Sequence, residues 1–449
     1  MSAKNPWKTQ NHSQFSLKNS WKSMVIYVMI SLVLILCYLS PFSLPTLTTY
    51  EKFSNISSIS IISSLSSNSP STSSSSPLQE FSKGHDDLQE TKINEIPTTC
   101  NYTNGEWIKD KKGPLYNGTS CGTIKDGQNC MSHGRPDIDY LYWRWKPMQC
   151  DLSRFDPKYF LQIFEGKHIA FVGDSLARNQ LESLLCMLSS ISTPNLVYSN
   201  GEENKFRRWH FPSHNVTVSV YWSPFLVKGV EKSKDQDYNT MYLDSVDEKW
   251  GSDLDSIDMV VLSIGHWYLL RGIYMDGKTE LGCHAMENVN CTDIGFYDAF
   301  GRAFNTSLKT IIQRRGGKSK GIDVVVTTFS PHHFEGDWDK FGACSKTMPY
   351  KEGEKEIDGM NNVLRRIAVE EVEKARSISL PNVRVAALDV TKLSLLRPDG
   401  HPGPYMYYNP FGDGIKERVH NDCVHWCLPG PIDTWNEIMS DIIRRWHTS

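Results

Sequence analysis

Five short apolar runs that alternate with helical stretches constrain the fold of this chain more than any other feature. The runs are 168–173, 216–222, 258–264, 322–329 and 383–389, and the helical stretches are 176–190, 298–314, 355–378 and 433–446. The short length and β-branched content of the runs favour buried strands over helix fragments. Strands that alternate with helices predict a parallel sheet with both faces covered. We therefore expect a three-layer α/β/α fold with roughly five parallel strands, whose active site lies at the C-terminal ends of the strands.

The N-terminal part predicts one membrane span. Residues 24–44 carry no charge, and the first charged residue after them is Glu51. Such a run is long enough to cross a bilayer as a helix. Four lysines precede it, which predicts a cytosolic N-terminus and a lumenal body: Lys4, Lys8, Lys18 and Lys22. A cleaved signal peptide is the alternative, and the length of the run and Pro41-Phe42 at its end disfavour it.

Composition divides the rest of the chain. A serine-rich stretch at 54–76 buries too little apolar surface to fold and predicts a flexible stem. A segment dense in cysteine, glycine and aromatic residues follows. The expected organisation is a cytosolic tail (1–23), a signal anchor (24–44), a lumenal stem (45–96), a cysteine-rich subdomain (97–156) and the main α/β domain (157–449).

Cysteines and glycosylation signals agree with a lumenal body. Of the 11 cysteines, Cys37 lies in the span and the other ten follow it, so up to five disulfides are expected in an oxidising compartment. Spacing predicts only the pair Cys283–Cys291. Six N-x-[S/T] triplets lie beyond the span, at Asn55, Asn101, Asn117, Asn215, Asn290 and Asn305.

Charge excludes nucleic-acid binding. The chain has 48 basic and 51 acidic residues, and the first 23 residues contain four lysines and no acid. The remainder therefore holds 44 basic residues against 51 acidic ones. A body with this balance lacks the positive surface that nucleic acids require.

A candidate nucleophile follows the first apolar run. Gly173-Asp174-Ser175 stands between that run and a helical stretch, so the Ser175 hydroxyl would project from the end of the sheet. The N-terminus of the following helix suits an oxyanion. The alternative is that Ser175 only caps the helix, since serine is a favoured cap residue.

A candidate base lies near the C-terminus. A serine hydroxyl needs a base that a third group orients, and Asp422-x-x-His425 offers both from one turn. Two alternatives remain for this segment: a zinc site that uses Cys423, His425 and Cys427, and a structural histidine inside a disulfide-rich loop.

Four aromatic residues in the cysteine-rich segment have two interpretations. They could form a face on which sugars stack, or they could fill the core of the subdomain: Tyr140, Tyr142, Trp143 and Trp145.

The segments FVGDSLARNQ (171–180) and NDCVHWCLPGPIDTWNE (421–437) together resemble the plant trichome birefringence-like family. GRPDIDYLYWRW (134–145) and LRPDGHPGPY (396–405) extend the resemblance, which covers 97–446. The family carries a PC-esterase domain related to the SGNH/GDSL hydrolases. The resemblance implies an SGNH-like fold and a Golgi polysaccharide O-acetyltransferase anchored by a single span. It also implies a triad of Ser175, His425 and Asp422, with no metal, no bound cofactor and an acetyl donor as co-substrate.

One departure from the wider SGNH pattern concerns the oxyanion hole. These hydrolases place a G-x-N-D block after the third strand, whereas this chain reads Gly265-His266-Trp267 there, without asparagine. The side-chain donor must then come from elsewhere, and Arg178 and Asn179 are the candidates, one helical turn after the nucleophile.

Four segments near the strand ends are expected to bind the acceptor. They are rich in His, Trp, Tyr and Asp, include His266, Trp267 and His401, and span 222–228, 265–268, 330–338 and 396–405. Ordinary loop packing is the alternative for residues such as Trp267 and His333. The segments resemble the xyloglucan-directed branch, so xyloglucan is the expected acceptor, with mannan or xylan as alternatives. A polysaccharide acetylesterase and a non-catalytic wall-polysaccharide-binding protein are further alternatives. A complex with acetyl-supplying membrane proteins or glycosyltransferases would fit the same picture.

Overall fold

The computed structural model describes residues 100–448, apart from 201–204, 288 and 416. The expected tail, membrane span and stem lie outside the described residues. Within the part that the structure describes, no helix is both long and apolar enough to cross a membrane.

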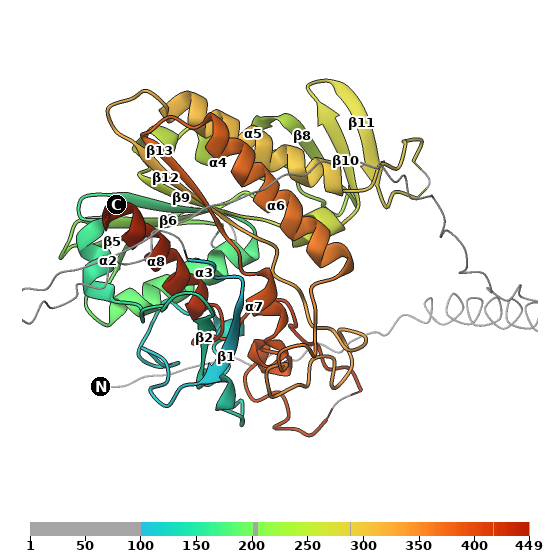
Figure 1. Ribbon diagram of the computed structural model, residues 1–449. Helices are drawn as coiled ribbons and strands as arrows, with labels where there is room; N and C mark the ends of the chain where they lie inside the picture. The colour runs from blue at the N-terminus through green and yellow to red at the C-terminus, as the bar shows by residue number, and fades with distance from the viewer. Residues whose placement is uncertain (1–99, 201–204, 288, 416, 449) are drawn as a thin grey trace, which may run out of the picture. The chain divides into compact units, whose positions relative to one another are not determined.

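A seven-stranded sheet forms the centre of the described chain (Figure 1). Its five parallel strands confirm the five predicted runs and neighbour one another in the order β13-β12-β9-β3-β6. Their bounds are β3 (His168–Gly173), β6 (Val216–Trp222), β9 (Met259–Ser263), β12 (Ile322–Thr327) and β13 (Val383–Leu388). Every residue of β3, β9 and β12 is buried, as expected for strands covered on both faces.

Helices cover both faces of the sheet, and the four predicted helices are confirmed. In Figure 1, α5 (Tyr297–Arg315) and α6 (Gly359–Ile378) lie above the sheet, and α3 (Ser175–Ser189) and α8 (Asp433–Thr448) lie below it with α2 (Pro157–Ile163). Alternate residues of β3 enter opposite cores. Ile169 and Phe171 pack with α3 and α8, while Ala170 and Val172 pack with α5 and α6. The three-layer arrangement follows from this alternation.

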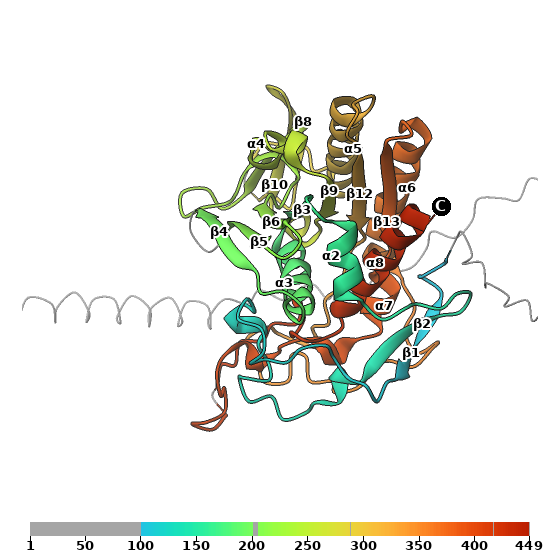
Figure 2. The ribbon, with the colours of Figure 1, turned by 90° about the vertical axis from the view of Figure 1, so that its left-hand side faces the viewer.

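The expectation of a parallel sheet is incomplete, because the sheets are mixed. Strands β4 (Asn195–Asn200) and β5 (Phe206–Phe211) extend the central sheet antiparallel beside β6, at the edge seen in Figure 2. A second sheet has the order β11-β10-β8-β7, with bounds β7 (Val227–Val230), β8 (Asn239–Val246), β10 (Gly272–Asp276) and β11 (Thr279–His284). These strands are not continuously apolar: β4 is exposed throughout, and β5 carries Arg207 and Arg208. A search of the sequence for buried apolar runs therefore does not detect these strands.

Five disulfides connect the described chain. They are Cys100–Cys150, Cys121–Cys186, Cys130–Cys427, Cys283–Cys291 and Cys344–Cys423, so the predicted pair is confirmed. The cysteine-rich segment contains a hairpin of β1 (Gly105–Lys109) and β2 (Trp143–Pro147). Tyr140 and Trp145 are buried, which supports the core interpretation of the aromatic cluster for these two residues.

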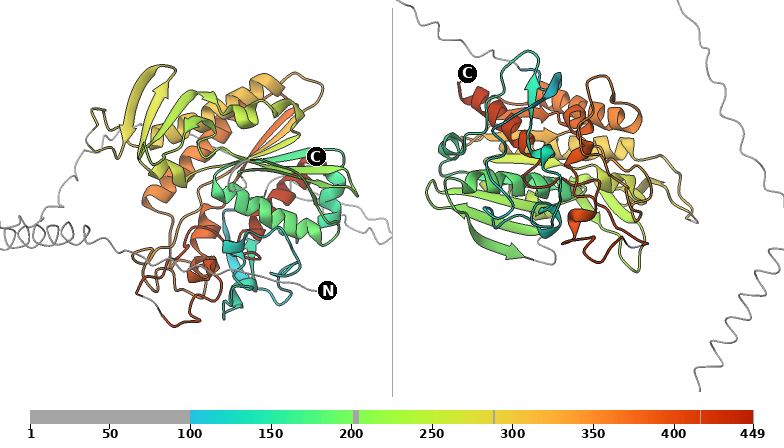
Figure 3. Two further views of the ribbon diagram at one scale, coloured as in Figure 1. Left: turned by 180° about the vertical axis from the view of Figure 1, so that it is seen from behind. Right: turned by 90° about the horizontal axis from the view of Figure 1, so that it is seen from below.

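Two distant parts of the sequence lie together below the sheet. Figures 1 and 3 show the segment from residue 100 to 150 beside the loops near residues 397–427. Arg135 donates to the carbonyl oxygens of Asp399 (2.6 Å) and His401 (2.9 Å), and Cys130–Cys427 adds a covalent link. The cysteine-rich segment therefore supports the loop that carries Asp422 and His425.

The remaining α-helices of the described residues are short: α4 (Glu248–Gly251) and α7 (Thr391–Leu395).

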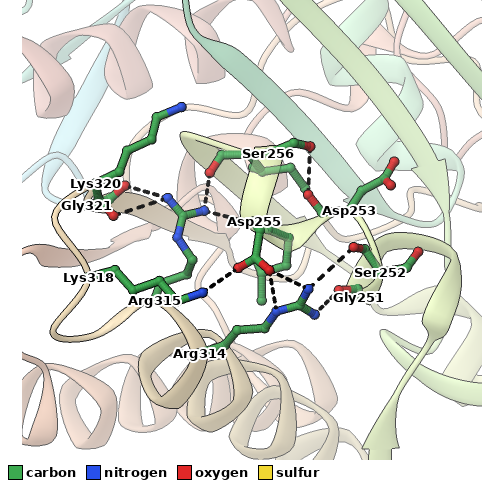
Figure 4. A network of polar contacts seen from close by, with 12 residues as sticks. Gly251, Ser252, Asp253, Asp255, Ser256, Arg314, Arg315, Lys318, Lys320 and Gly321 are labelled. Atoms are coloured by element: carbon green, nitrogen blue, oxygen red, sulfur yellow. Dashed lines mark hydrogen bonds and ion pairs between the residues drawn. The ribbon is translucent and has the colours of Figure 1, made fainter.

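A charged network lies at the N-terminal ends of strands β9 and β12 (Figure 4). Asp255 accepts from Arg314 (2.8 Å) and Lys318 (2.9 Å). Buried Arg315 donates to the carbonyl oxygens of Leu254 and Ile257, just before β9 begins. These contacts join the C-terminal end of α5 to the start of β9, away from the strand ends where the candidate site lies.

Candidate active site

The turn between β3 and α3 places Ser175 at the start of the helix. A side chain at Gly173 is excluded, because an added Cβ would lie 1.8 Å from the carbonyl oxygen of Ser263. The Asp174 N–H donates to that same oxygen (3.1 Å), so the turn is held against the end of β9. The N-cap is Asp174, whose carboxylate accepts from the Leu176 N–H (2.9 Å). The interpretation of Ser175 as the helix cap is therefore wrong, since Asp174 is the N-cap residue.

Asp422 and His425 form a partly buried acid–base pair, with side chains that are 14% and 21% exposed. Nδ1 of His425 lies 2.7 Å from Oδ2 of Asp422, and Oδ1 accepts from the backbone N–H groups of Val424 (3.1 Å) and His425 (2.9 Å). Burial alone would raise the pKa of Asp422, but the His425 charge and these hydrogen bonds hold that pKa well below its usual range. The carboxylate is therefore ionised, and the proton on Nδ1 points toward it. Nε2 of His425 is buried and has no hydrogen-bond partner among the described residues.

The Asn179 amide joins the helix of Ser175 to the loop of His425. Its nitrogen donates to the carbonyl oxygen of Trp426 (3.2 Å), and its oxygen accepts from the Trp426 N–H (2.8 Å). The first turns of α3 thus dock directly beside His425. This arrangement gives Asn179 a positioning role, and its amide oxygen and nitrogen both point to the loop rather than to the expected oxyanion.

The segment after β9 brings Gly265, His266 and Trp267 to the site. Gly265 acts on Asp174, the residue before the nucleophile. Burial raises the pKa of Asp174 to about 6, and the Leu176 N–H, the His425 charge and the Gly265 N–H oppose this rise. Nε2 of His266 donates to the carbonyl oxygen of Ser330 (3.0 Å), and burial lowers the pKa of His266 to about 4, so the ring is neutral.

Trp267 belongs to an aromatic wall at the strand ends. Its ring meets Trp222, at the end of β6, edge to face at 5.5 Å. The Arg178 guanidinium lies 5.6 Å from the Trp222 ring, and its Nε lies 4.0 Å from a carboxylate oxygen of Glu182. Arg178 is therefore held beside the wall, one turn after Ser175. Sequence reasoning missed Glu182, although its spacing from Arg178 places both on one helix face.

His401 is held by contacts within the protein. It is 4% exposed, although it also lines a cavity of about 230 Å³ together with Arg135, Tyr405 and Phe411. Nδ1 donates to the carbonyl oxygen of His425 (2.7 Å), Nε2 lies 2.7 Å from Nδ1 of His333, and the ring stacks on Trp426 at 4.2 Å. His401 therefore supports the backbone at His425. The loop-packing interpretation of His333 is also supported, since its Nε2 bonds the Leu395 carbonyl oxygen (2.9 Å).

The zinc site considered for Cys423, His425 and Cys427 lacks the thiolate ligands it would need. Cys423 and Cys427 are both in disulfides, so neither offers a thiolate. Across residues 100–448, with the gaps named above, no group of three or more His, Cys, Asp or Glu side chains is arranged to hold a metal ion.

The fold and the site together define a member of the SGNH-like esterases. Residues 152–442 match the PC-Esterase family, described as a GDSL/SGNH-like acyl-esterase family found in Pmr5 and Cas1p, and residues 98–151 match the PMR5 N-terminal domain. The chain belongs to the PC-esterase family.

Comparison with curated proteins adds named relatives within this family. The chain is 63% identical to Xyloglucan O-acetyltransferase 1 of Populus trichocarpa over 352 residues, which is 78% of this chain and 82% of that protein. It is 55% identical to Xyloglucan O-acetyltransferase 1 of Arabidopsis thaliana over 374 residues, 83% of this chain and 86% of that one. Protein trichome birefringence-like 26 of Arabidopsis thaliana is 44% identical over 346 residues, 76% of each chain. The family resemblance found in the sequence is confirmed.

The contacts of His401 predict a positioning role. Replacing His401 by Ala removes the bond to the His425 carbonyl oxygen and the stack on Trp426, so the base loses its support. We expect kcat for acetyl transfer to fall about 10- to 100-fold, with little change in KM for the acceptor. Steady-state kinetics of the folded variant test this. A rise in KM with kcat unchanged would instead indicate that His401 contacts the sugar.

Glu182 predicts a pH-dependent difference in stability. Burial raises the pKa of Glu182 from 4.5 to about 7, against the opposing charges of Arg178, Lys125 and His425. A carboxyl group whose pKa is higher in the folded chain stabilises the fold when protonated, and this contribution is lost as the pH rises from about 4.5 to about 7. The amide of Glu182→Gln stays neutral at every pH. Its free energy of unfolding, measured with denaturant, should therefore rise relative to that of wild type by more than about 1 kcal/mol across that interval. A difference that does not change with pH would contradict the shift.

Proposed function

We propose that this chain is a xyloglucan O-acetyltransferase that works through an acetyl-Ser175 intermediate. The observation that carries the mechanism is the docking of Trp426, and with it the Asp422–His425 pair, on the helix that begins at Ser175. The identities to xyloglucan O-acetyltransferases support the choice of reaction and acceptor.

In the first half-reaction, Ser175 takes the acetyl group. Nε2 of His425 accepts the hydroxyl proton while Oγ attacks the acetyl carbonyl of the donor. Asp422 holds the Nδ1–H tautomer and stabilises the imidazolium that forms. The leaving group departs with the proton from His425, and an ester remains on Ser175.

In the second half-reaction, a sugar hydroxyl takes the acetyl group. His425 removes the proton of that hydroxyl as its oxygen attacks the ester carbonyl, and Ser175 Oγ regains a proton as it leaves. The backbone N–H of Ser175 at the positive end of α3 stabilises the tetrahedral oxyanion, with the Gly265 N–H and the Arg178 guanidinium as further donors.

The same residues would serve an acetylesterase if water replaced the sugar hydroxyl. The names of the relatives favour transfer to xyloglucan over hydrolysis and over transfer to mannan or xylan. An ionised Asp422 beside His425 also argues against a protein that only binds wall polysaccharide.

Acetyl transfer to xyloglucan oligosaccharides should depend on both the serine and the base. In the purified full-length chain, Ser175→Ala and His425→Ala should each lower the transfer rate by several orders of magnitude, because the members of such a unit fail together. Asp422→Asn should lower it somewhat less. The assay counts labelled acetyl on the oligosaccharide, with mannan, xylan and pectin oligomers as competing acceptors. Near-normal transfer by folded His425→Ala would contradict the mechanism, and transfer only to another polymer would contradict the acceptor.

We also propose that the chain is a single-pass Golgi protein with a lumenal C-terminus, as the uncharged run at 24–44 and the lysines before it indicate. Four asparagines of the glycosylation triplets are exposed and are the expected acceptors: Asn101, Asn117, Asn215 and Asn290. The acetyl donor would be a separate molecule, supplied by a membrane partner, and the enzyme could work in a complex with glycosyltransferases.

Protease protection tests this topology. In sealed Golgi vesicles, added protease should remove only about the first 23 residues, and endoglycosidase should lower the mass of the protected fragment. Digestion of the C-terminal body in intact vesicles would reverse the orientation.

A further inference from the structure

A cavity of about 450 Å³ lies beside the first turns of α3, and the chemistry described above leaves it without a role. Its walls come from the loop at 122–126, from α3 and from the edge strands β4 and β5. The residues that the argument uses are Arg178 and Glu182 on α3, Leu196 on β4, and Arg207 and Trp209 on β5.

The polar walls of the cavity include Lys125 and Asp126 as well as Arg178, Glu182 and Arg207, and these last three have unmet hydrogen-bonding capacity. The side chains of Arg178 and Glu182 are 10% and 7% exposed. Nε of each arginine and Oε2 of Glu182 are buried without a hydrogen-bond partner among the described residues. Burial lowers the pKa of Arg207, and the neighbouring Glu182 opposes this effect. Unsatisfied buried groups of this kind are costly, so a bound molecule that supplies partners would be favoured.

The mixture of charges in these walls selects the class of ligand. The carboxyl groups of Glu182 and Asp126 beside the basic side chains disfavour a phosphate or another anion. Vicinal hydroxyls suit these walls, because a hydroxyl can donate to or accept from the carboxyl group of Glu182, whose pKa is about 7, and can accept from a guanidinium. Trp209 and Leu196 supply apolar surface for the less polar face of a sugar ring.

The cavity also lies close to the nucleophile. Arg178 is three residues after Ser175 and reaches from the cavity to the ring of Trp222. The charge of His425 contributes to the pKa of Glu182, which places the base within electrostatic reach of the cavity. A polysaccharide chain could therefore extend from the cavity, past Ser175, to the wall of Trp222 and Trp267.

We propose that this cavity is a subsite for an uncharged sugar unit of the acceptor chain, next to the unit that receives the acetyl group. The inference rests on the proposed function and adds to it the place where the acceptor is held. It assigns Arg207 and Glu182 to acceptor binding and gives Arg207 no part in acylation of Ser175.

The two half-reactions can be measured separately in the full-length chain. With 4-nitrophenyl acetate as donor, acylation breaks the aryl ester bond, forms the Ser175 ester and releases 4-nitrophenol. Transfer is then followed as acetyl on a xyloglucan oligosaccharide over a range of acceptor concentrations. The variants are Arg207→Met, which keeps the apolar stem, and Glu182→Gln, which keeps the shape. Arg314→Met removes an arginine from the network at the N-terminal ends of β9 and β12 and serves as the matched control. Thermal melting verifies that each variant is folded.

Arg207→Met should raise KM for the oligosaccharide about tenfold or more, as expected for loss of a hydrogen bond to a charged group. Glu182→Gln should raise it less. The release of 4-nitrophenol should stay close to wild type in Arg207→Met, and Arg314→Met should change neither measurement. Calorimetric titration of the oligosaccharide into the same variants carrying Ser175→Ala should show the same loss of affinity without turnover.

Unchanged affinity for the oligosaccharide in Arg207→Met and Glu182→Gln would overturn the inference. Equal slowing of 4-nitrophenol release in Arg207→Met would also overturn it, since the cavity would then serve the donor or the fold. A wild-type protein that binds the oligosaccharide with the predicted dependence on Arg207 but transfers acetyl only to water would contradict the proposed function and support the subsite.

Discussion

The two hydrogen bonds between the Asn179 amide and the backbone of Trp426 are the constraint on which the site depends. They join residues 247 positions apart, one in the helix of the nucleophile and one next to the base. An amide satisfies a backbone N–H and a backbone C=O at once, so the loop has a fixed register against the helix. Both groups are buried, which makes any other position of the loop costly.

The surrounding structure reinforces that register from several directions. Cys130–Cys427 and Cys344–Cys423 attach the loop to the cysteine-rich segment and to the residues after β12. His401 bonds the His425 carbonyl oxygen, and the backbone of Gly403 pairs with that of Asp422. The loop has little regular secondary structure, so these side-chain and covalent contacts perform the positioning that a strand or helix would otherwise provide.

The sequence predicts the central layers well because they depend on local patterns. Five β-branched runs and four helices are recognisable within single segments, and Gly-Asp-Ser and Asp-x-x-His carry their chemistry in adjacent residues. The edge strands β4 and β5 are not predicted, because β4 is exposed throughout and the apolar residues of β5 are interrupted by Arg207, Arg208 and His210. The role of His401 could not be derived, since a histidine in a loop rich in glycine and proline suits sugar binding equally well. Its burial results from Trp426 and His333, which are distant in sequence.

The central claim is that acetyl passes through Ser175, and peptide mass mapping tests it most directly. The full-length protein is mixed with an excess of acetyl donor, quenched in acid, digested and mapped, with and without a subsequent chase by xyloglucan oligosaccharide. The account predicts an acetyl ester on the peptide that contains Ser175, which disappears during the chase as acetylated oligosaccharide forms. Acetylated oligosaccharide formed while Ser175 remains unmodified at every quench time would contradict it.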